Sequence, residues 1–147
     1  MRIARIIGIG VTLVVVSGCA ATGPLYKDVA ASFPPAPSDK GRIFFFRPDT
    51  MFGAAITADI RLNNRVVGLS ERGSFFYVDE KPGKCTVATS TEVEKQLTFT
   101  LDRGETRYVK TSVSFGALVG RINPELVSPT EAKAELVELH YTGGAKK

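Results

Sequence analysis

The sequence of 147 residues contains one histidine, two cysteines and no tryptophan. One histidine excludes metal sites built on paired histidines, and the two cysteines, 66 positions apart, form no zinc-binding pattern. A Ser–His–carboxylate triad would have to bring His140, near the end of the chain, to a distant serine such as Ser112. We therefore expect a protein that is not an enzyme, with no cofactor and no metal ion.

An excess of one charge is also missing. The chain carries 19 basic and 15 acidic side chains, a formal net charge of +4, and its longest basic run is Lys146-Lys147. Nucleic-acid-binding domains concentrate positive charge on one face or along one helix. We therefore expect no nucleic-acid partner.

Long hydrophobic runs are absent except at residues 6–16, which follow Arg2 and Arg5. Positive charge followed by a short apolar run is the layout of a secretory signal peptide. A helix of eleven residues rises about 16 Å, roughly half of the ~30 Å hydrocarbon core, and is too short for a permanent span.

The tetrad Val16-Ser17-Gly18-Cys19 resembles a lipobox, in which a branched apolar residue and two small residues precede a cysteine. The resemblance implies that residues 1–18 are a signal peptide, that cleavage falls between Gly18 and Cys19, and that Cys19 receives acyl chains. Several acyl chains make membrane attachment effectively permanent. Ala20 stands where inner-membrane lipoproteins of enterobacteria carry aspartate, so the resemblance implies the outer membrane, facing the periplasm. The alternative is an uncleaved apolar helix with an incidental cysteine.

Residues 19–40 are rich in proline and carry few branched apolar side chains. Such segments favour polyproline geometry of about 3.1 Å per residue, so we expect a tether that reaches as far as about 65 Å from the bilayer. Leu25, Tyr26 and Phe33 are the candidates to dock on the domain or to rest at the lipid interface. We expect residues 40–147 to fold independently of this tether.

Residues 41–147 predict a mainly β fold. Short β-rich runs separated by glycine, proline and asparagine turns recur at intervals typical of an antiparallel β-sandwich of about seven strands. Asn63-Asn64 predicts a two-residue hairpin turn, because asparagine tolerates positive φ. Ser128, Pro129 and Glu131 form a capping-box pattern that predicts one C-terminal helix over residues 129–140. The strands are expected at residues 42–47, 57–62, 65–69, 73–79, 85–91, 95–101 and 106–115.

Several of these runs also resemble a known family. The segments 41–48 (GRIFFFRP), 52–55 (FGAA), 62–63 (LN), 73–76 (GSFF) and 82–83 (PG) are similar to the bacterial lipoprotein domain of unknown function 2846. Residues 73–87 are also similar to β-sandwich modules of the PEGA and transthyretin-like kind. The resemblance implies a β-sandwich with no assigned chemistry and no functional residues to carry over.

Cys85 lies in an alternating stretch and is expected to be a small buried hydrophobe. An intermolecular disulfide or a reactive thiol is the alternative interpretation.

Two connections share the motif Phe-Gly-Ala and are more apolar than ordinary sandwich loops, which face water. They have two interpretations: plugs that close the core at an open end, or an exposed patch that receives a partner protein, a lipid or an apolar ligand. Phe115 continues the inward register of Val109 and Val113, so we expect it to be buried and Phe52 to be partly exposed. The residues of the possible patch are Met51, Phe52, Gly53, Phe115, Gly116 and Leu118.

These observations favour a membrane-anchored envelope protein that acts as a non-catalytic binding or scaffolding module, with an envelope protein as its expected partner. The alternative is a carrier of a lipid or small apolar ligand, which requires an enclosed cavity in the sandwich.

Overall fold

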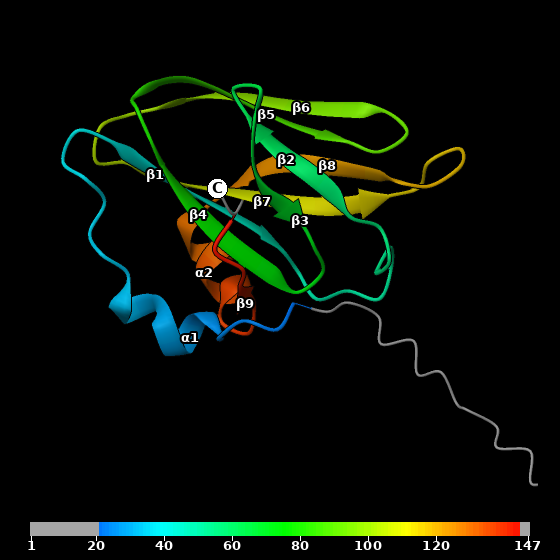
Figure 1. Ribbon diagram of the computed structural model, residues 1–147, viewed down its shortest axis with the longest axis horizontal. Helices are drawn as coiled ribbons and strands as arrows, with labels where there is room; N and C mark the ends of the chain where they lie inside the picture. The colour runs from blue at the N-terminus through cyan, green and yellow to red at the C-terminus, as the bar shows by residue number, and fades with distance from the viewer. Residues whose placement is uncertain (1–20, 145–147) are drawn as a thin grey trace, which may run out of the picture.

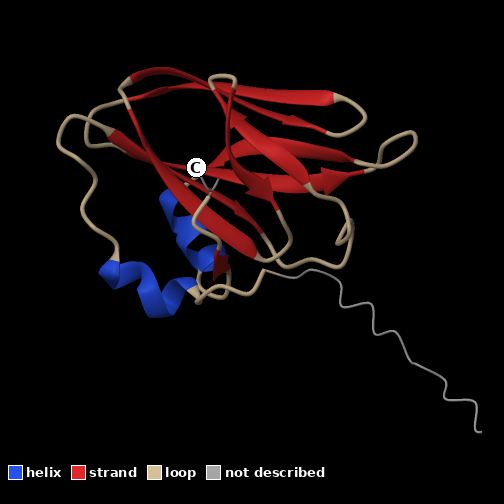
Figure 2. Cartoon of the chain, viewed as in Figure 1, coloured by secondary structure: helices blue, strands red, loops and turns tan. Residues whose placement is uncertain are grey.

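A computed structural model describes residues 21–144, and it contains two β-sheets packed face to face with helices against the outer face of one of them (Figures 1 and 2). The β-sandwich predicted from the sequence is therefore confirmed. The signal peptide, Gly18 and Cys19 lie outside the described residues. The strands are β1 (Gly41–Arg47), β2 (Ala58–Leu62), β3 (Arg65–Ser70), β4 (Ser74–Glu80), β5 (Gly83–Ser90), β6 (Glu94–Leu101), β7 (Thr106–Ser114), β8 (Arg121–Val127) and β9 (His140–Tyr141).

The larger sheet has the strand order β8-β7-β1-β4-β9, and the smaller one has the order β3-β2-β5-β6. All seven residues of β1 are buried, as expected of a central strand. Most pairings are antiparallel, but β1 runs parallel to β7 and β4 runs parallel to β9. The Asn63-Asn64 turn between β2 and β3 has φ of 49° and 66°, as the sequence predicts.

Apolar side chains from both sheets fill the space between them. Phe45 stacks on Phe76 at a ring-centroid distance of 5.2 Å, and Cys85 is buried beside them, as expected. Burial in this cluster raises the pKa of the Cys85 thiol. The cluster consists of Ile43, Phe45, Ile60, Leu62, Val67, Phe76, Cys85, Val87, Phe99, Leu101 and Val109.

A second apolar cluster lies on the outer face of the larger sheet, under α1 (Tyr26–Val29), a 3₁₀ turn (Ala30–Ser32) and α2 (Pro129–Leu136). Ala132 and Leu136 of α2 are fully buried against this face. Tyr26, Val29 and Phe33 pack on the same cluster. The fold therefore has three layers, and its N-terminal segment belongs to one of them.

This packing corrects the expectation of an extended tether for residues 21–40, and it confirms that Tyr26 and Phe33 dock on the domain. The Tyr26 amide donates to the Leu139 carbonyl at 2.9 Å, and the Tyr141 amide donates to the Pro24 carbonyl at 2.8 Å. The Arg42 guanidinium forms two hydrogen bonds with Asp79 and donates a third, of 2.7 Å, to the Pro34 carbonyl. From Ala21 onward, the proline-rich segment is part of the domain.

The C-terminal helix is shorter than the predicted range 129–140, since it ends at Leu136. Its N-cap is confirmed, because the Ser128 hydroxyl accepts from the Glu131 amide at 3.2 Å. The last residue of the predicted range, His140, opens the edge strand β9, which pairs with β4.

Candidate functional site

One end of the sandwich gathers the connections that carry the predicted patch. Because β1 and β7 are parallel, both finish at the same end of the larger sheet, where β4 and β8 begin. Residues 48–57, 71–73, 91–93 and 115–120 connect strands there, on the right in Figure 1, and together we call them the loop end. The opposite end is formed by residues 63–64, 81–82 and 102–105.

The two Phe-Gly-Ala connections meet at the loop end. The Phe52 and Phe115 rings lie edge to face, with their centroids 4.8 Å apart. Phe52 is 47% exposed, Phe115 83%, Met51 79% and Leu118 91%. The four large apolar residues of the predicted patch are therefore exposed, two of them in contact, and Phe52 is partly exposed as expected.

The expectation that Phe115 points inward is wrong. Val109 and Thr111 of β7 are buried, and Val113 is half-buried, so the inward register holds along the strand. However, β7 ends at Ser114, which pairs with Arg121, and Phe115 follows it in the turn. Strand alternation does not extend past the last paired residue, so the Phe115 ring is free to leave the core.

Gly53 allows the first Phe-Gly-Ala loop, residues 48–57, to approach β7. Its φ is +67°, and a Cβ atom added there would lie 2.5 Å from Cγ1 of Val113. A Cβ atom on Gly116 would lie 1.9 Å from Oε1 of Glu92. Both glycines thus have a packing role under the patch, although neither contributes apolar surface of its own.

Arg47, the last residue of β1, holds the first loop from below. Its side chain is fully buried and donates to the carbonyls of Gly53 at 2.6 Å, Ile56 at 2.5 Å and Ser70 at 3.3 Å. Burial, and then the nearby charge of Arg72, lower the pKa of Arg47. The sequence does not predict this supporting role, because there Arg47 is only the polar end of an apolar strand.

Glu92 binds the second Phe-Gly-Ala loop, residues 115–120. Its carboxylate accepts from the amides of Ala117 at 2.7 Å, Leu118 at 2.8 Å and Val119 at 3.4 Å. Hydrogen bonds from these amides, that of Leu118 foremost, lower the pKa of Glu92 below its ordinary range. The local pattern of residues 90–94 does not predict this contact, whose partner lies 25 positions away in the sequence.

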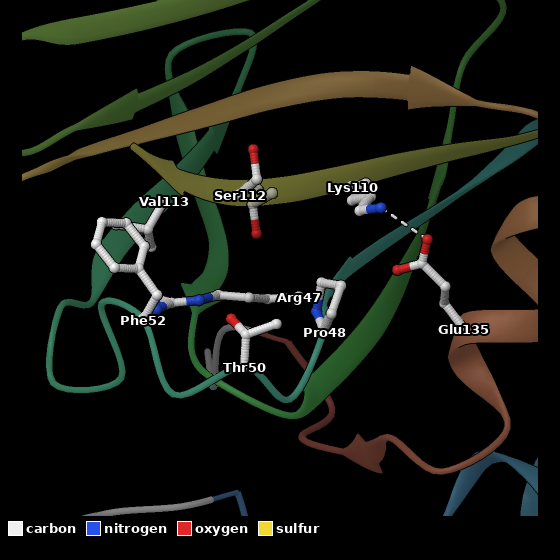
Figure 3. Close-up of a pocket in the computed structure, with 9 residues that line it drawn as sticks. Arg47, Pro48, Thr50, Phe52, Lys110, Ser112, Val113 and Glu135 are labelled. Carbon is white, nitrogen blue, oxygen red and sulfur yellow. Dashed lines mark hydrogen bonds and ion pairs between the residues drawn. The ribbon is translucent and has the colours of Figure 1, made fainter. Parts of the chain in front are cut away.

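A cleft of about 400 Å³ lies beside Phe52, between the end of β1, β7 and α2 (Figure 3). At its α2 side, the Lys110 ammonium contacts the Glu135 carboxylate at 2.7 Å, and that hydrogen bond raises the pKa of Lys110. The cleft is lined by Arg47, Pro48, Thr50, Phe52, Lys110, Thr111, Ser112, Val113 and Glu135.

The structure does not bring together Ser112 and His140, the pair that the sequence offered as an example of a triad. Ser112 lies on β7 and His140 on β9, with β1 and β4 between them in the sheet. The His140 Nδ1 atom is instead 2.5 Å from the Gly23 carbonyl oxygen. Within residues 21–144, no three His, Cys, Asp or Glu side chains gather in a geometry that could hold a metal ion.

No helix within residues 21–144 has the length and apolar character needed to cross a membrane.

Two comparisons with known proteins give a match. A family model described as "Protein of unknown function (DUF2846)" matches residues 37–122, which include both loops of the patch. An uncharacterised protein of Haemophilus influenzae is 28% identical over 142 residues, 93% of this chain and 82% of that protein. No solved structure matches the chain.

Proposed function

Since the chain belongs to the DUF2846 family, whose description names no activity, we propose a function from its own sequence and surface. The protein is a lipid-anchored module of the bacterial envelope that binds or scaffolds and does not catalyse. Its acyl chains are carried by Cys19, and it faces the periplasm from the outer membrane.

The anchor is supported by the first nineteen residues. Two arginines, a short apolar run and the tetrad Val16-Ser17-Gly18-Cys19 occur in the order that lipoprotein maturation requires. Ala20 supports the outer membrane, since it does not resemble the retention signal of inner-membrane lipoproteins.

The observation that carries the binding role is the exposed Phe52–Phe115 pair. Folding leaves these two aromatic rings in contact with each other and with water, on loops fixed from below by Arg47 and Glu92. Contiguous exposed apolar surface on rigid supports is typical of a binding surface. A surface of this kind serves association and needs no reactive group.

A carrier role is less well supported. A sandwich that carried an apolar ligand would need an internal cavity. The space enclosed between the sheets beside Phe45, Ile60 and Phe76 is too small to admit a water molecule.

Photo-crosslinking in living cells tests the proposed role. A photoreactive amino acid is placed at Leu118, which is 91% exposed at the loop end, and at Arg103, which is exposed at the opposite end, as the matched control. We expect the acylated protein to form an adduct from position 118 and none from position 103. An acylated protein that forms no adduct at 118, or equal adducts at both positions, contradicts the binding role of the loop end.

A further inference from the structure

The two ends of the sandwich differ sharply in polarity. Within residues 21–144, ten large hydrophobic side chains are exposed, and six of them lie at the loop end. None lies in the turns of the opposite end, where Asn63, Lys81 and Arg103 face the solvent. The six are Met51, Phe52, Val93, Phe115, Leu118 and Val119.

The start of the described chain is fixed at the loop end as well. The Gly23 carbonyl oxygen contacts His140 Nδ1, and the His140 amide donates to the Gly73 carbonyl at 2.9 Å. Gly73 is the residue before β4, in the loop end itself. In Figure 1 the described chain begins at the blue end, on the lower side of the molecule.

This position limits how far the domain can stand from its anchor. Cys19 precedes Gly23 by four residues, which span at most about 14 Å when fully extended. Gly23 itself is packed closely against β9, because a Cβ atom there would lie 1.8 Å from the Tyr141 carbonyl oxygen. An acylated Cys19 would thus place the bilayer within about 14 Å of Gly23, beside the loop end.

The patch is within reach of the same bilayer. Gly23 lies along the β9 edge of the larger sheet and Phe115 follows β7 near the β8 edge. Five strands spaced about 4.8 Å apart separate these edges by about 19 Å, which a flat membrane surface spans without distortion of the domain.

We propose that the loop end rests on the membrane that holds the acyl chains of Cys19, with Phe52, Phe115 and Leu118 in its lipid–water interface. The inference rests on the proposed lipid anchor and names the partner of the proposed binding surface as the lipid itself. Apolar and aromatic side chains on a rigid support partition into this interface in proportion to the apolar area they bury. The anchor fixes the distance, and the patch fixes the orientation.

The charges of the loop end indicate which lipids are needed. Arg72 is paired with Asp49 at 2.5 Å, and the Glu92 carboxylate is occupied by the amides of the second loop. The patch therefore offers apolar surface and no cluster of free cations among the described residues. Its contact with the bilayer is expected to be independent of anionic lipid and insensitive to salt.

Tryptophan fluorescence tests the contact directly, because the natural chain has no tryptophan. The full acylated protein is reconstituted into phosphatidylcholine vesicles as two variants, Leu118→Trp and the matched control Arg103→Trp. We expect the emission maximum of Leu118→Trp to lie at a shorter wavelength than that of a tryptophan exposed to water. We also expect this emission to be quenched by lipids brominated near the headgroup. The emission of Arg103→Trp should show neither effect.

Intact mass of each preparation separates the two ways of failing. If Cys19 carries acyl chains and Leu118→Trp is neither shifted nor quenched, the membrane contact is refuted while the anchor stands. A shift that appears only after envelope proteins are added also refutes it and assigns the patch to a protein partner. If Cys19 carries no acyl chain in the cell, the proposed function fails and the inference fails with it. Should Leu118→Trp fail to fold by circular dichroism, Val119→Trp, at a 59% exposed position, takes its place.

Discussion

The Phe52–Phe115 pair makes a quantitative prediction about stability. We compare Phe52→Ala and Phe115→Ala with Phe76→Ala, which removes a ring that is 1% exposed between the sheets. A fully buried aromatic side chain removes about 150–250 Å² from water, and each Å² contributes about 25 cal/mol. The cost of each truncation should therefore follow the buried fraction of the ring.

Phe115 is 83% exposed, so only about a sixth of its surface is buried. This corresponds to roughly 25–40 Å², and Phe115→Ala should cost less than about 1 kcal/mol. Phe52 is 47% exposed, so Phe52→Ala should lower the free energy of unfolding by about 2 kcal/mol. Phe76→Ala should cost about 3–5 kcal/mol, because it also leaves a cavity in the core.

Urea unfolding of the chain from residue 21 onward measures these costs. The double variant Phe52→Ala/Phe115→Ala adds a check on the ring contact, since an exposed edge-to-face pair should give a coupling of about 0.5 kcal/mol, which is part of the cost of each single truncation. A loss of 3 kcal/mol or more in Phe115→Ala would refute the exposed patch and restore Phe115 to the core.

Three further predictions concern the anchor, the N-terminal segment and the second loop. Cys19→Ala should leave a protein of precursor mass without acyl chains, and a mature-length, lipid-bearing product in intact mass spectrometry would exclude the lipobox. A chain that begins at residue 34 loses Tyr26, Val29 and Phe33 from the outer cluster, so it should be about 3 kcal/mol less stable to urea than one that begins at residue 21; equal urea midpoints would show that the docked segment contributes nothing. The pKa of Glu92 is lowered in the folded state, so the stability that its ionised carboxylate contributes is present above the ordinary carboxyl pKa of about 4.3. This stability is lost as the pH falls through and below that value. Urea unfolding between neutral pH and pH 3 should show a smaller acid-induced loss of stability in Glu92→Gln than in the natural chain, and an identical loss would refute the role of this carboxylate.

Much of the sandwich could be predicted because its signals are local. Alternation along β2 places Ile60 and Leu62 inward, and both are fully buried. Asn63 and Asn64 specify their own turn through positive φ. Ser128 specifies the start of α2 through a bond to a residue three positions away.

The sequence did not predict strand β8, because Pro124 interrupts the alternating pattern of this strand. The position of Pro124 in the sheet explains why a proline is tolerated there. Glu105 accepts a hydrogen bond from the Arg42 amide, so the odd-numbered residues of β7 direct their backbone groups toward β1. Pro124 lies opposite Thr111, in a pair that shares no backbone hydrogen bond, on the edge strand of the sheet.

The site itself depended on contacts that sequence patterns do not report. The meeting of Phe52 with Phe115 requires the parallel pairing of β1 with β7, whose residues are 64 positions apart in the chain. The supports beneath the two rings, Arg47 and Glu92, bind backbone groups of distant loops. Composition identified the patch, whereas only the topology places it at one end.

The bond between the two ends of the described chain sets the order in which the molecule can assemble. Residues 24–27 form backbone hydrogen bonds with residues 137–141, so the N-terminal segment cannot dock until strand β9 has been synthesised. Contacts of such long sequence separation close late, because the loop entropy must be overcome before they form. During synthesis the N-terminal segment therefore stays unpaired, and it closes onto the sheet only after residues 137–141 have been made.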